Sequence, residues 1–216
     1  MKRPELRTEP VPEATSHRLS LLLRSLRSLA AAGVLTASSY EIAARFSLNS
    51  AQIRKDLAQF GEFGVRGVGY RVADLKAHLK ALMGLHVTHA LGIAGAGKLG
   101  QALADSPNFN AEGFRVAALF EVDGRKVGGR SRTGVPIHDV QALERFVKEL
   151  GIEIGILAIP AEGALSLAQR MAAAGVRAVL NFAPVTVPAL PGVLVKNLDL
   201  TFFLENLSFQ LAIARS

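Results

Sequence analysis

The chain has 216 residues, a formal net charge of +7 and no cysteine, which excludes disulfides, thiolate metal sites and thiol redox chemistry. Half of its residues are hydrophobic, enough for a packed core in one large domain or two small ones. No uninterrupted apolar run approaches the ~18–20 residues of a membrane span, and no apolar segment follows the basic start Met1–Arg3. We therefore expect a cytoplasmic protein with no membrane segment.

The positive charge is concentrated in the N-terminal part. Residues 1–85 contain 13 Lys and Arg against 7 Asp and Glu, whereas residues 86–216 contain 12 against 11. A basic segment joined to a near-neutral one indicates contact with a polyanion such as nucleic acid. A solvated basic surface would give the same count.

The chain begins with a predicted flexible arm. Residues 1–16 contain three prolines among charged side chains. From His17, leucines recur at helical spacing up to Gly33, which predicts a first helix. Three arginines of this helix lie off the apolar stripe and are expected in solvent: Arg18, Arg24 and Arg27.

Two short helices joined by a tight turn follow, which is the pattern of a helix-turn-helix. Ser38 and Glu41 form a capping box that opens the first of them, predicted to run through Phe46. Asn49 or Ser50 caps the second, which is predicted to end before Gly61.

The second short helix, predicted from Ala51 to Phe60, has two different faces. Ile53, Leu57 and Phe60 face the core, Ala51, Lys55 and Ala58 face outward, and Arg54 and Gln59 lie at the flanks. Such a surface fits the major groove of DNA, although an ordinary surface helix is the alternative.

A glycine-rich segment at 63–71 predicts a tight β-hairpin, or wing. Its polar side chains could bind phosphates or enter a minor groove: Arg66, Tyr70 and Arg71. A purely structural hairpin with Tyr70 packed down is the alternative. A helix from Ala73 to Met83 then leads to Gly84, where we place a domain boundary.

The stretch from Thr88 to Glu121 has the order of a dinucleotide-binding unit. An apolar segment is followed by Gly95-Ala96-Gly97-Lys98-Leu99-Gly100, which matches G-x-G-x-x-G between a strand and a helix. In this motif the glycines allow a tight turn, a close approach to the pyrophosphate and helix–strand packing. A second strand ends at Glu121, 21 residues after the last glycine, where a carboxylate meets ribose hydroxyls. A close-packed glycine turn without a ligand is the alternative.

The same residues nearly match a second nucleotide motif. Gly92, Gly97 and Lys98 have the spacing of a P-loop, but Leu99 stands where a Ser or Thr hydroxyl holds magnesium. This substitution argues against a nucleotide hydrolase.

The rest of the chain alternates strands and helices, which predicts a doubly wound parallel sheet. The expected elements are a turn-rich connection at 128–135, a helix capped by Asp139, strands at 152–160, 178–181 and 193–196, and a helix at 164–174 stopped by Gly175. Ligands lie at the carboxyl ends of such strands. Ala158, Pro160 and Asn181 should therefore border the nicotinamide end of a bound dinucleotide.

The final segment, 199–216, is apolar around most of a helix's circumference. Because a terminal helix on a small domain has few internal neighbours, we expect it to be buried against a second subunit. This predicts a homodimer whose C-terminal helices pack together or exchange.

Several of these motifs together resemble the Rex family of bacterial redox-sensing transcriptional repressors. The segments that carry the resemblance are Arg54-Lys55-Asp56-Leu57, Phe60-Gly61, Arg66-Gly67-Val68-Gly69-Tyr70, Gly95 to Gly100 and Asn181-Phe182-Ala183-Pro184. The resemblance extends from about Ala14 to the C-terminus. It implies an α/β chain with a flexible arm (1–16), a winged helix-turn-helix domain (17–84), a Rossmann NAD(H)-binding domain (85–198) and a domain-swapped helix (199–216).

The resemblance also implies a function. Members are homodimeric repressors of palindromic operator DNA, and NADH releases them whereas NAD⁺ does so poorly; no catalysis and no metal are involved. Our candidate DNA-binding residues are Arg18, Ser50, Ala51, Arg54, Lys55, Arg66, Gly67 and Tyr70. Our candidate dinucleotide-binding residues are Gly95, Ala96, Gly97, Lys98, Leu99, Gly100, Glu121, Ala158, Pro160, Asn181 and Asp199, the last of them reaching the partner's nicotinamide site. Two departures are Glu121, where the family often has Asp, and Ser106, where some members have Tyr.

Two other functions fit parts of the sequence. An NAD-dependent dehydrogenase needs a proton donor beside the nicotinamide and a substrate domain, but His86 and His89 lie at or before the first strand, His138 lies in a predicted loop, and no second domain follows. A DNA-binding regulator that responds to NADPH or another adenine nucleotide is the second alternative. It would use Arg125 and Lys126 for a 2′-phosphate, which the Glu121 carboxylate would repel.

Overall fold

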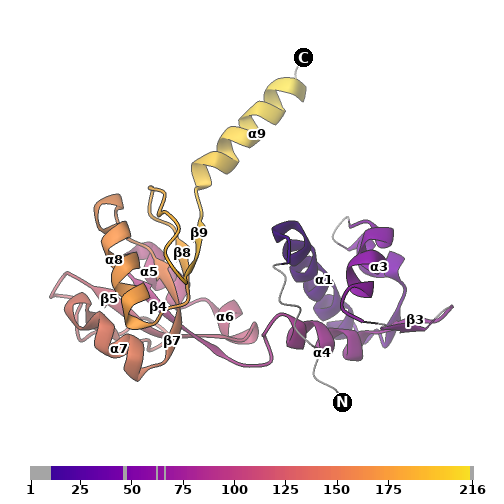
Figure 1. Ribbon diagram of the computed structural model, residues 1–216, viewed down its shortest axis with the longest axis horizontal. Helices are drawn as coiled ribbons and strands as arrows, with labels where there is room; N and C mark the ends of the chain where they lie inside the picture. The colour runs from indigo at the N-terminus through magenta and orange to yellow at the C-terminus, as the bar shows by residue number, and fades with distance from the viewer. Residues whose placement is uncertain (1–10, 46–47, 62, 66, 215–216) are drawn as a thin grey trace. The chain divides into compact units, whose positions relative to one another are not determined.

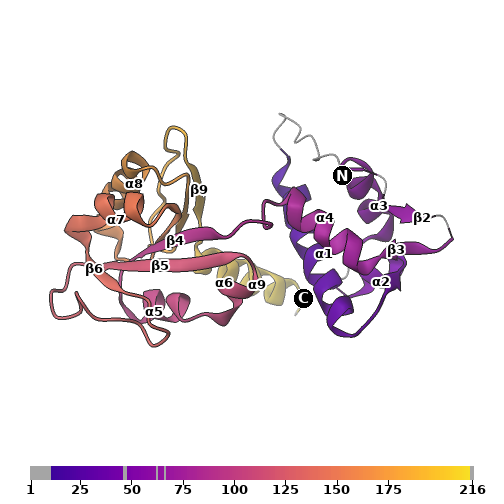
Figure 2. The ribbon, with the colours of Figure 1, turned by 90° about the horizontal axis from the view of Figure 1, so that it is seen from below.

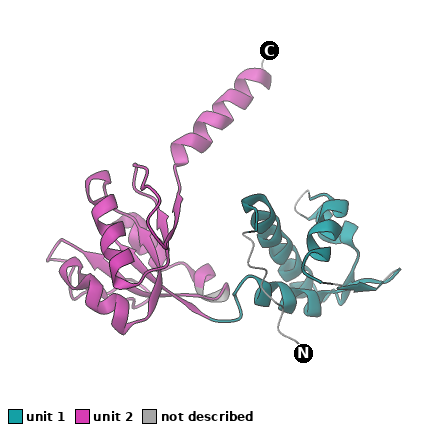
Figure 3. Ribbon diagram, viewed as in Figure 1, with its two compact units in different colours: residues 1–87 teal, residues 88–216 magenta. Residues whose placement is uncertain are grey.

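Figure 1 traces the chain in a computed structural model that describes residues 11–45, 48–61, 63–65 and 67–214. The chain forms two compact units, residues 1–87 and residues 88–216 (Figure 3). Each unit has its own hydrophobic core, so each is described by itself.

Unit 1 is a winged helix-turn-helix domain, as predicted. Its helices are α1 (Glu13–Ala31), α2 (Ser39–Ala44), α3 (Ser50–Ala58) and α4 (Val72–Leu82), and its strands are β1 (Thr36–Ala37), β2 (Gly64–Val65) and β3 (Gly69–Arg71). The strands pair antiparallel in the order β1-β3-β2, and β2–β3 form the predicted hairpin. Helices α1 and α4 lie side by side (Figure 2). The sequence did not predict β1.

Local capping explains the short helices of unit 1. The Ser38 side chain accepts a hydrogen bond from Glu41 N while the Glu41 carboxylate accepts one from Ser38 N, which completes the capping box. The Asn49 side chain accepts from the N–H groups of Ala51 and Gln52 and fixes the start of α3.

Three boundary predictions in unit 1 need correction or lie outside the described residues. Helix α1 starts at Glu13 rather than His17, so residues 13–16 are helical and not part of an arm. Pro12 has a fixed φ and stands at the N-cap, immediately before the helix, and the negative charge of Glu13, the first helical residue, is favourable at the helix N-terminus. Helix α3 ends at Ala58 instead of Phe60. Phe46 lies outside the described residues.

Unit 2 is a six-stranded parallel sheet in the order β6-β5-β4-β7-β8-β9. The strands are β4 (His89–Ala94), β5 (Phe114–Glu121), β6 (Ile137–Asp139), β7 (Ile152–Leu157), β8 (Ala178–Asn181) and β9 (Leu194–Asn197). The helices are α5 (Lys98–Ala104), α6 (Pro107–Ala111), α7 (Leu143–Glu149), which follows the 3-10 turn η1 (Val140–Ala142), α8 (Ala161–Ala174) and α9 (Leu200–Ala214). In chain order the strands read 3-2-1-4-5-6, which is the Rossmann topology.

Helices cover both faces of this sheet. Helices α5 and α6 lie on one face, and α7 and α8 lie on the other (Figure 2). Double coverage explains why β4 and the second half of β5 are buried almost without interruption. Strand order reverses between β4 and β7, and ligands of such sheets bind outside the carboxyl ends at that point.

Some predictions for unit 2 were wrong in detail. Strand β6 was not predicted, and His138 lies in it rather than in a loop. Strand β7 ends at Leu157, three residues before the predicted Pro160, because Pro160 caps helix α8, which begins at Ala161 rather than Ala164. The predicted stop of that helix is confirmed, since Gly175 has a left-handed backbone at φ 113°.

Helix α9 has no buried residue within the chain. Each of its large apolar side chains is more than half exposed: Leu200, Phe202, Phe203, Leu204, Leu207, Phe209, Leu211 and Ile213. No other element of unit 2 lies along it in Figure 1. Burial of this helix therefore requires a partner. In the described part of the chain, no helix combines the length and the apolar character needed to cross a membrane.

Candidate DNA interface and dinucleotide site

The outer face of helix α3 is as predicted. Ile53 and Leu57 are each only 2% exposed and hold the helix on the core of unit 1. The three residues predicted on the opposite side, Ala51, Lys55 and Ala58, are exposed, and so is Arg54 at the flank. Ser50, the first residue of the helix, is half-buried. A protruding helix with small and cationic side chains outward is the feature that enters a major groove.

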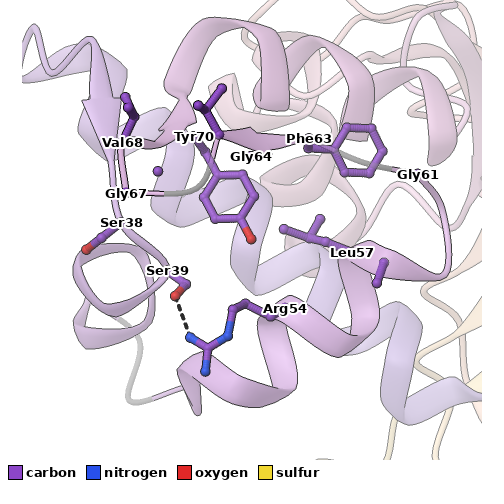
Figure 4. A pocket seen from close by; sticks show the side chains of 13 residues that line it. Ser38, Ser39, Arg54, Leu57, Gly61, Phe63, Gly64, Gly67, Val68 and Tyr70 are labelled. Atoms are coloured by element: carbon purple, nitrogen blue, oxygen red, sulfur yellow. Dashed lines mark hydrogen bonds between the residues drawn. The ribbon is translucent and has the colours of Figure 1, made fainter.

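Arg54 is positioned by a contact that the sequence did not reveal. Its Nη1 donates to the Ser39 hydroxyl at 2.8 Å, which ties α3 to the start of α2 (Figure 4). Ser39 had no recognisable signal, because its partner lies 15 residues away on another helix.

The wing next to α3 is built on glycine. Gly67 and Gly69 have φ of +81° and +94°, which favours glycine at both positions. Tyr70 pairs with Gly64 across the hairpin, and a Cβ on Gly64 would lie 3.0 Å from the Tyr70 ring. The ring is thus half-buried, as the structural alternative for Tyr70 required. Arg66 lies outside the described residues.

The expectation that Arg18 is a solvent-exposed DNA contact is not supported. Its guanidinium forms a forked ion pair with Asp56 of α3, with Nη2–Oδ1 at 2.8 Å, and also donates to the Thr15 hydroxyl. Gln52 donates a further hydrogen bond to the same carboxylate. The hydrogen bond from Arg18 holds the pKa of Asp56 below its usual value, against the effect of burial. Arg27, also expected in solvent, is half-buried, and burial lowers its pKa, whereas Arg24 is exposed.

The dinucleotide loop, Gly95 to Gly100, has a geometry that requires two of its glycines. Gly95 has φ +99°, and a Cβ there would meet the Ala158 carbonyl oxygen at 2.3 Å. A Cβ on Gly100 would lie 1.8 Å from the Gly95 carbonyl oxygen. A Cβ on Gly97 would instead point into open space, so a ligand can approach the backbone there.

The loop leads into helix α5, for which Gly97 is the N-cap without any side-chain cap. Ala96 is fully buried, whereas Lys98 and Leu99 are exposed in the first turn. Uncapped N–H groups and the positive end of a helix dipole favour a phosphate at this position. The local residues therefore fit a pyrophosphate.

Glu121 lies beside this loop at the end of β5. Its carboxylate accepts four hydrogen bonds, from the N–H groups of Ala96 (3.1 Å), Val122 (2.7 Å) and Asp123 (3.2 Å) and from Lys126 Nζ (3.2 Å). Burial alone would raise the pKa of Glu121, but these donors outweigh it and the pKa is lowered. The group is thus a carboxylate at neutral pH, directly linked to the dinucleotide loop.

Of the three residues expected at the nicotinamide end, Ala158 lies beside the dinucleotide loop, Pro160 is exposed and Asn181 is buried. Ala158 N donates to the Ala94 carbonyl at 2.8 Å, so the end of β7 lies against the dinucleotide loop. Pro160 follows as an exposed cap of α8. Asn181 is only 1% exposed, and its amide bonds the Val185 carbonyl and the Asn197 side chain. Its expected role as a direct ligand is not supported, because its polar atoms are used inside the protein.

Asp199 is the last of the predicted coenzyme residues, and Ser106 is the position where some family members have Tyr. Asp199 is exposed, and its carboxylate accepts from Thr201 N at the start of α9. Ser106 precedes helix α6.

His138 and His89, two histidines weighed for a dehydrogenase, are engaged in contacts within the protein. The His138 ring stacks on Phe146 with centroids 3.6 Å apart, and burial followed by the nearby Arg145 lowers its pKa. His89 Nδ1 lies 2.7 Å from Glu153 at the opposite, amino-terminal end of the strands. Within the residues that the structure describes, no group of three or more His, Asp or Glu side chains could hold a metal ion.

Known proteins resemble both units. Residues 10–58 match a family model described as a putative DNA-binding protein N-terminus, and residues 86–185 match one described as a CoA binding domain. A redox-sensing transcriptional repressor Rex from Syntrophomonas wolfei is 45% identical over 94% of this chain and 96% of its own length. A redox-sensing transcriptional repressor Rex 1 from Thermotoga maritima is 41% identical over 94% of this chain and 97% of its own length.

The chain belongs to the Rex family.

Solved structures of a Rex-family repressor, RSP, agree with this assignment. The complex of RSP with β-NAD⁺ and operator DNA has a TM-score of 0.89 and 35% identity, and covers 96% of this chain and 95% of RSP. The complex with β-NADH has a TM-score of 0.84 and 33% identity, and covers 96% of this chain and 97% of RSP. The Rex fold predicted from the motifs is confirmed. The relatives are repressors, so the dehydrogenase alternative has no support from them.

Proposed function

We propose that this Rex-family chain is a redox-sensing transcriptional repressor. A homodimer binds palindromic operator DNA in the cytoplasm and releases it when NADH binds, and it thereby reports the ratio of NADH to NAD⁺. The proposal rests on one observation above all: a winged helix-turn-helix unit and a Rossmann unit with an intact dinucleotide loop occur in one chain that matches Rex repressors along nearly their full length.

In this proposal the Rossmann unit binds the coenzyme. The backbone at Gly97 and the start of α5 face the pyrophosphate, and Gly95 and Gly100 keep the loop tight enough for this contact. Glu121, already ionised and held beside the loop, accepts from the ribose hydroxyls in place of the partly exposed Lys126 ammonium, because its four acceptor positions are otherwise filled. The same carboxylate disfavours the 2′-phosphate of NADPH, because two anions would share a partly buried site.

The winged helix unit binds the DNA. Helix α3 enters the major groove with Ala51 and Lys55 outward, and the wing approaches the adjacent backbone. The exposed apolar helix α9 is the dimerisation element, and exchange of this helix between subunits is part of the proposal. Ligand binding changes DNA affinity only through a difference in its affinity for two dimer arrangements. Asp199, at the start of α9, is the candidate that reaches the partner's nicotinamide.

A gel shift tests the whole proposal. Palindromic duplex DNA selected by the protein from a random-sequence pool is incubated with the full chain and with NADH, NAD⁺ or NADPH separately. NADH should abolish the shifted band at a concentration at which NAD⁺ leaves it in place, and NADPH should act more weakly than NADH. Protein that stays on DNA at saturating NADH, with binding of NADH verified by calorimetry, would contradict the proposal. The Asp199→Ala variant should change the ratio of NADH to NAD⁺ affinities, and an unchanged ratio removes Asp199 from the mechanism.

A further inference from the structure

Two asparagine side chains join the last two strands of unit 2 at their carboxyl ends. Asn181 is the last residue of β8, Asn197 is the last residue of β9, and the two lie opposite each other in the parallel pair. The Asn181 amide Nδ2 donates to Asn197 Oδ1 at 2.8 Å. Asn181 is only 1% exposed, and Asn197 is half-buried. We call this pair the asparagine clamp.

The clamp holds the proline-rich connection between β8 and β9. Asn197 Oδ1 also accepts from Val187 N at 2.9 Å, and Asn197 Nδ2 donates to the Val187 carbonyl at 3.0 Å. The Asn181 side chain donates to the Val185 carbonyl and accepts from Ala183 N. Val187 is itself only 1% exposed and belongs to the hydrophobic core. The clamp therefore fixes the middle of the connection, as well as its two ends, on the edge of the sheet.

On one side the clamp adjoins the coenzyme crevice. Phe182 N donates to the carbonyl of Leu157, the last residue of β7. The next residue of that chain segment, Ala158, lies so close to the dinucleotide loop that a Cβ on Gly95 would meet its carbonyl oxygen at 2.3 Å. Backbone hydrogen bonds thus connect Asn181 with the loop, and a shift of the end of β7 reaches the clamp without any contact between Asn181 and a ligand.

On its other side the clamp adjoins α9. Leu198 N donates to the Asn181 carbonyl at 2.8 Å, so the chain is still held to the sheet one residue beyond β9. The Asp199 carboxylate accepts from Thr201 N and caps the start of α9. Figure 1 shows β9 leading directly into this helix. The backbone of Leu198 and Asp199 therefore sets the direction in which α9 leaves the sheet.

The length of α9 amplifies small changes at this point. Its 15 residues, at a rise of ~1.5 Å each, make a helix about 22 Å long. A tilt of about 10° at the start displaces the far end of such a helix by about 4 Å. Apolar contacts require heavy atoms within ~4.5 Å of each other, so a shift of this size exchanges one set of contacts for another. Since large apolar side chains are exposed along the whole of α9, its direction decides the geometry of a dimer built on it.

We propose that Asn197, held by Asn181, is a positioning residue that sets the direction of α9 and thereby couples the coenzyme crevice to the arrangement of the dimer. This inference rests on the proposed function and deepens it by naming the element that connects ligand and dimer. NADH at the carboxyl ends of β4 and β7 shifts the end of β8, the clamp passes the shift to β9, and α9 converts it into a different spacing of the DNA-binding units. Neither asparagine needs to contact the coenzyme or the DNA.

The test compares coupling with binding in the full-length protein. Asn197→Ala removes three hydrogen bonds of the clamp and leaves the dinucleotide loop unchanged. Calorimetry should give a dissociation constant for NADH within about 3-fold of the wild-type value. The factor by which saturating NADH weakens DNA binding, measured by fluorescence anisotropy, should fall about 5–10-fold. An unchanged factor overturns the proposal. A loss of NADH affinity of more than about 10-fold would place Asn197 in coenzyme binding itself and also overturns it.

A milder variant tests the hydrogen bonds themselves. Asn197→Asp keeps the two bonds that Oδ1 accepts and loses the one that Nδ2 donates to Val187. Its coupling factor should lie between the wild-type value and that of Asn197→Ala. If Asn197→Ala does not fold, Asn197→Asp carries the test alone, and a wild-type coupling factor in Asn197→Asp then overturns the proposal.

A distance measurement separates a change of geometry from a loss of stability. Because the chain contains no cysteine, Lys148→Cys on the exposed surface of α7 attaches one spin label to each subunit. Pulsed electron resonance should show a narrow distribution of the distance between the two labels of a dimer, and NADH should shift it. Asn197→Ala should broaden this distribution with and without NADH. A narrow distribution that NADH still shifts in Asn197→Ala would contradict the proposed role of the clamp.

Controls separate this inference from its foundation. Thr186→Ala changes an exposed side chain of the same connection outside the clamp and should leave the coupling factor and the distances unchanged. Light scattering should give a dimeric mass for Asn197→Ala, since the apolar surface of α9 is intact; a monomeric mass would mean that Asn197 is required for association, and the coupling role fails. If NADH does not weaken DNA binding by the wild type, the proposed function itself fails. If it does and Asn197→Ala responds equally, only the role of the clamp fails.

Discussion

The ion pair between Arg18 and Asp56 makes the sharpest prediction for unit 1. It joins α1 to the recognition helix α3, and Asp56 is nearly buried whereas Arg18 keeps 28% of its side chain exposed. The Asp56 carboxylate accepts two hydrogen bonds from Arg18 and one from Gln52. A hydrogen bond to a charged group contributes ~1.5–3 kcal/mol, and the exposed part of Arg18 weakens the pair.

We therefore expect Asp56→Asn and Arg18→Met each to lower the free energy of unfolding of unit 1 by about 2–3 kcal/mol, because either change leaves a charge without its partner. For a unit of this size the unfolding temperature should fall by on the order of 10–20 °C. The double variant should lose much less than the sum of the single losses, since both remove the same interaction.

Calorimetry of the full chain, with NADH present to stabilise unit 2, measures the transition of unit 1. The pair also predicts a pH dependence. Because the native pKa of Asp56 lies below its ordinary 3.8, the stabilisation is present above the unfolded pKa and is lost as the pH falls through the lowered native value. Asp56→Asn should abolish that loss.

A different result would support the prediction from the sequence that Arg18 binds DNA. If Arg18 binds DNA, Arg18→Met should reduce the salt dependence of DNA affinity while the unfolding temperature stays unchanged. Additive losses in the double variant, within about 0.5 kcal/mol, would show that the two side chains do not act as a pair.

Three further predictions concern unit 2. Gly100→Ala places a methyl group 1.8 Å from the Gly95 carbonyl oxygen, so the loop must shift. The affinity for NADH, measured by calorimetry, should fall at least about 10-fold. Gly124→Ala is the control, because a Cβ there meets open space and should not alter the fold. Glu121→Gln keeps the size of the side chain but removes the carboxylate, whose pKa is lowered. Titrations should show weaker NADH binding and a smaller preference for NADH over NADPH. An unchanged preference would mean that another group excludes the 2′-phosphate. Phe203→Glu with Leu207→Glu on the exposed face of α9 should give monomers by light scattering, and a dimeric mass in this variant would show that α9 is not the dimerisation element.

The sequence alone determined the features that depend on neighbouring residues. The capping box at Ser38 and the Gly175 stop were predicted because caps act within a single turn, and the cap of α3 was predicted to be Asn49 or Ser50, of which the structure shows Asn49. The dinucleotide loop and Glu121 were predicted because a strand–loop–helix–strand unit fixes their spacing in the chain.

Tertiary structure decided what depends on distant partners. Arg18 contacts Asp56, 38 residues away, and Asn181 contacts Asn197, 16 residues away. Because of these contacts, Arg18 is not a solvent-exposed DNA contact and Asn181 is not a direct ligand of the coenzyme, as the sequence had suggested. Strand β6 has three residues in a turn-rich segment and exists only through pairing with β5. Hydrophobic periodicity predicted that α9 needs a partner, but only the folded chain showed that all of its apolar residues remain exposed, because burial is a property of packing and not of sequence.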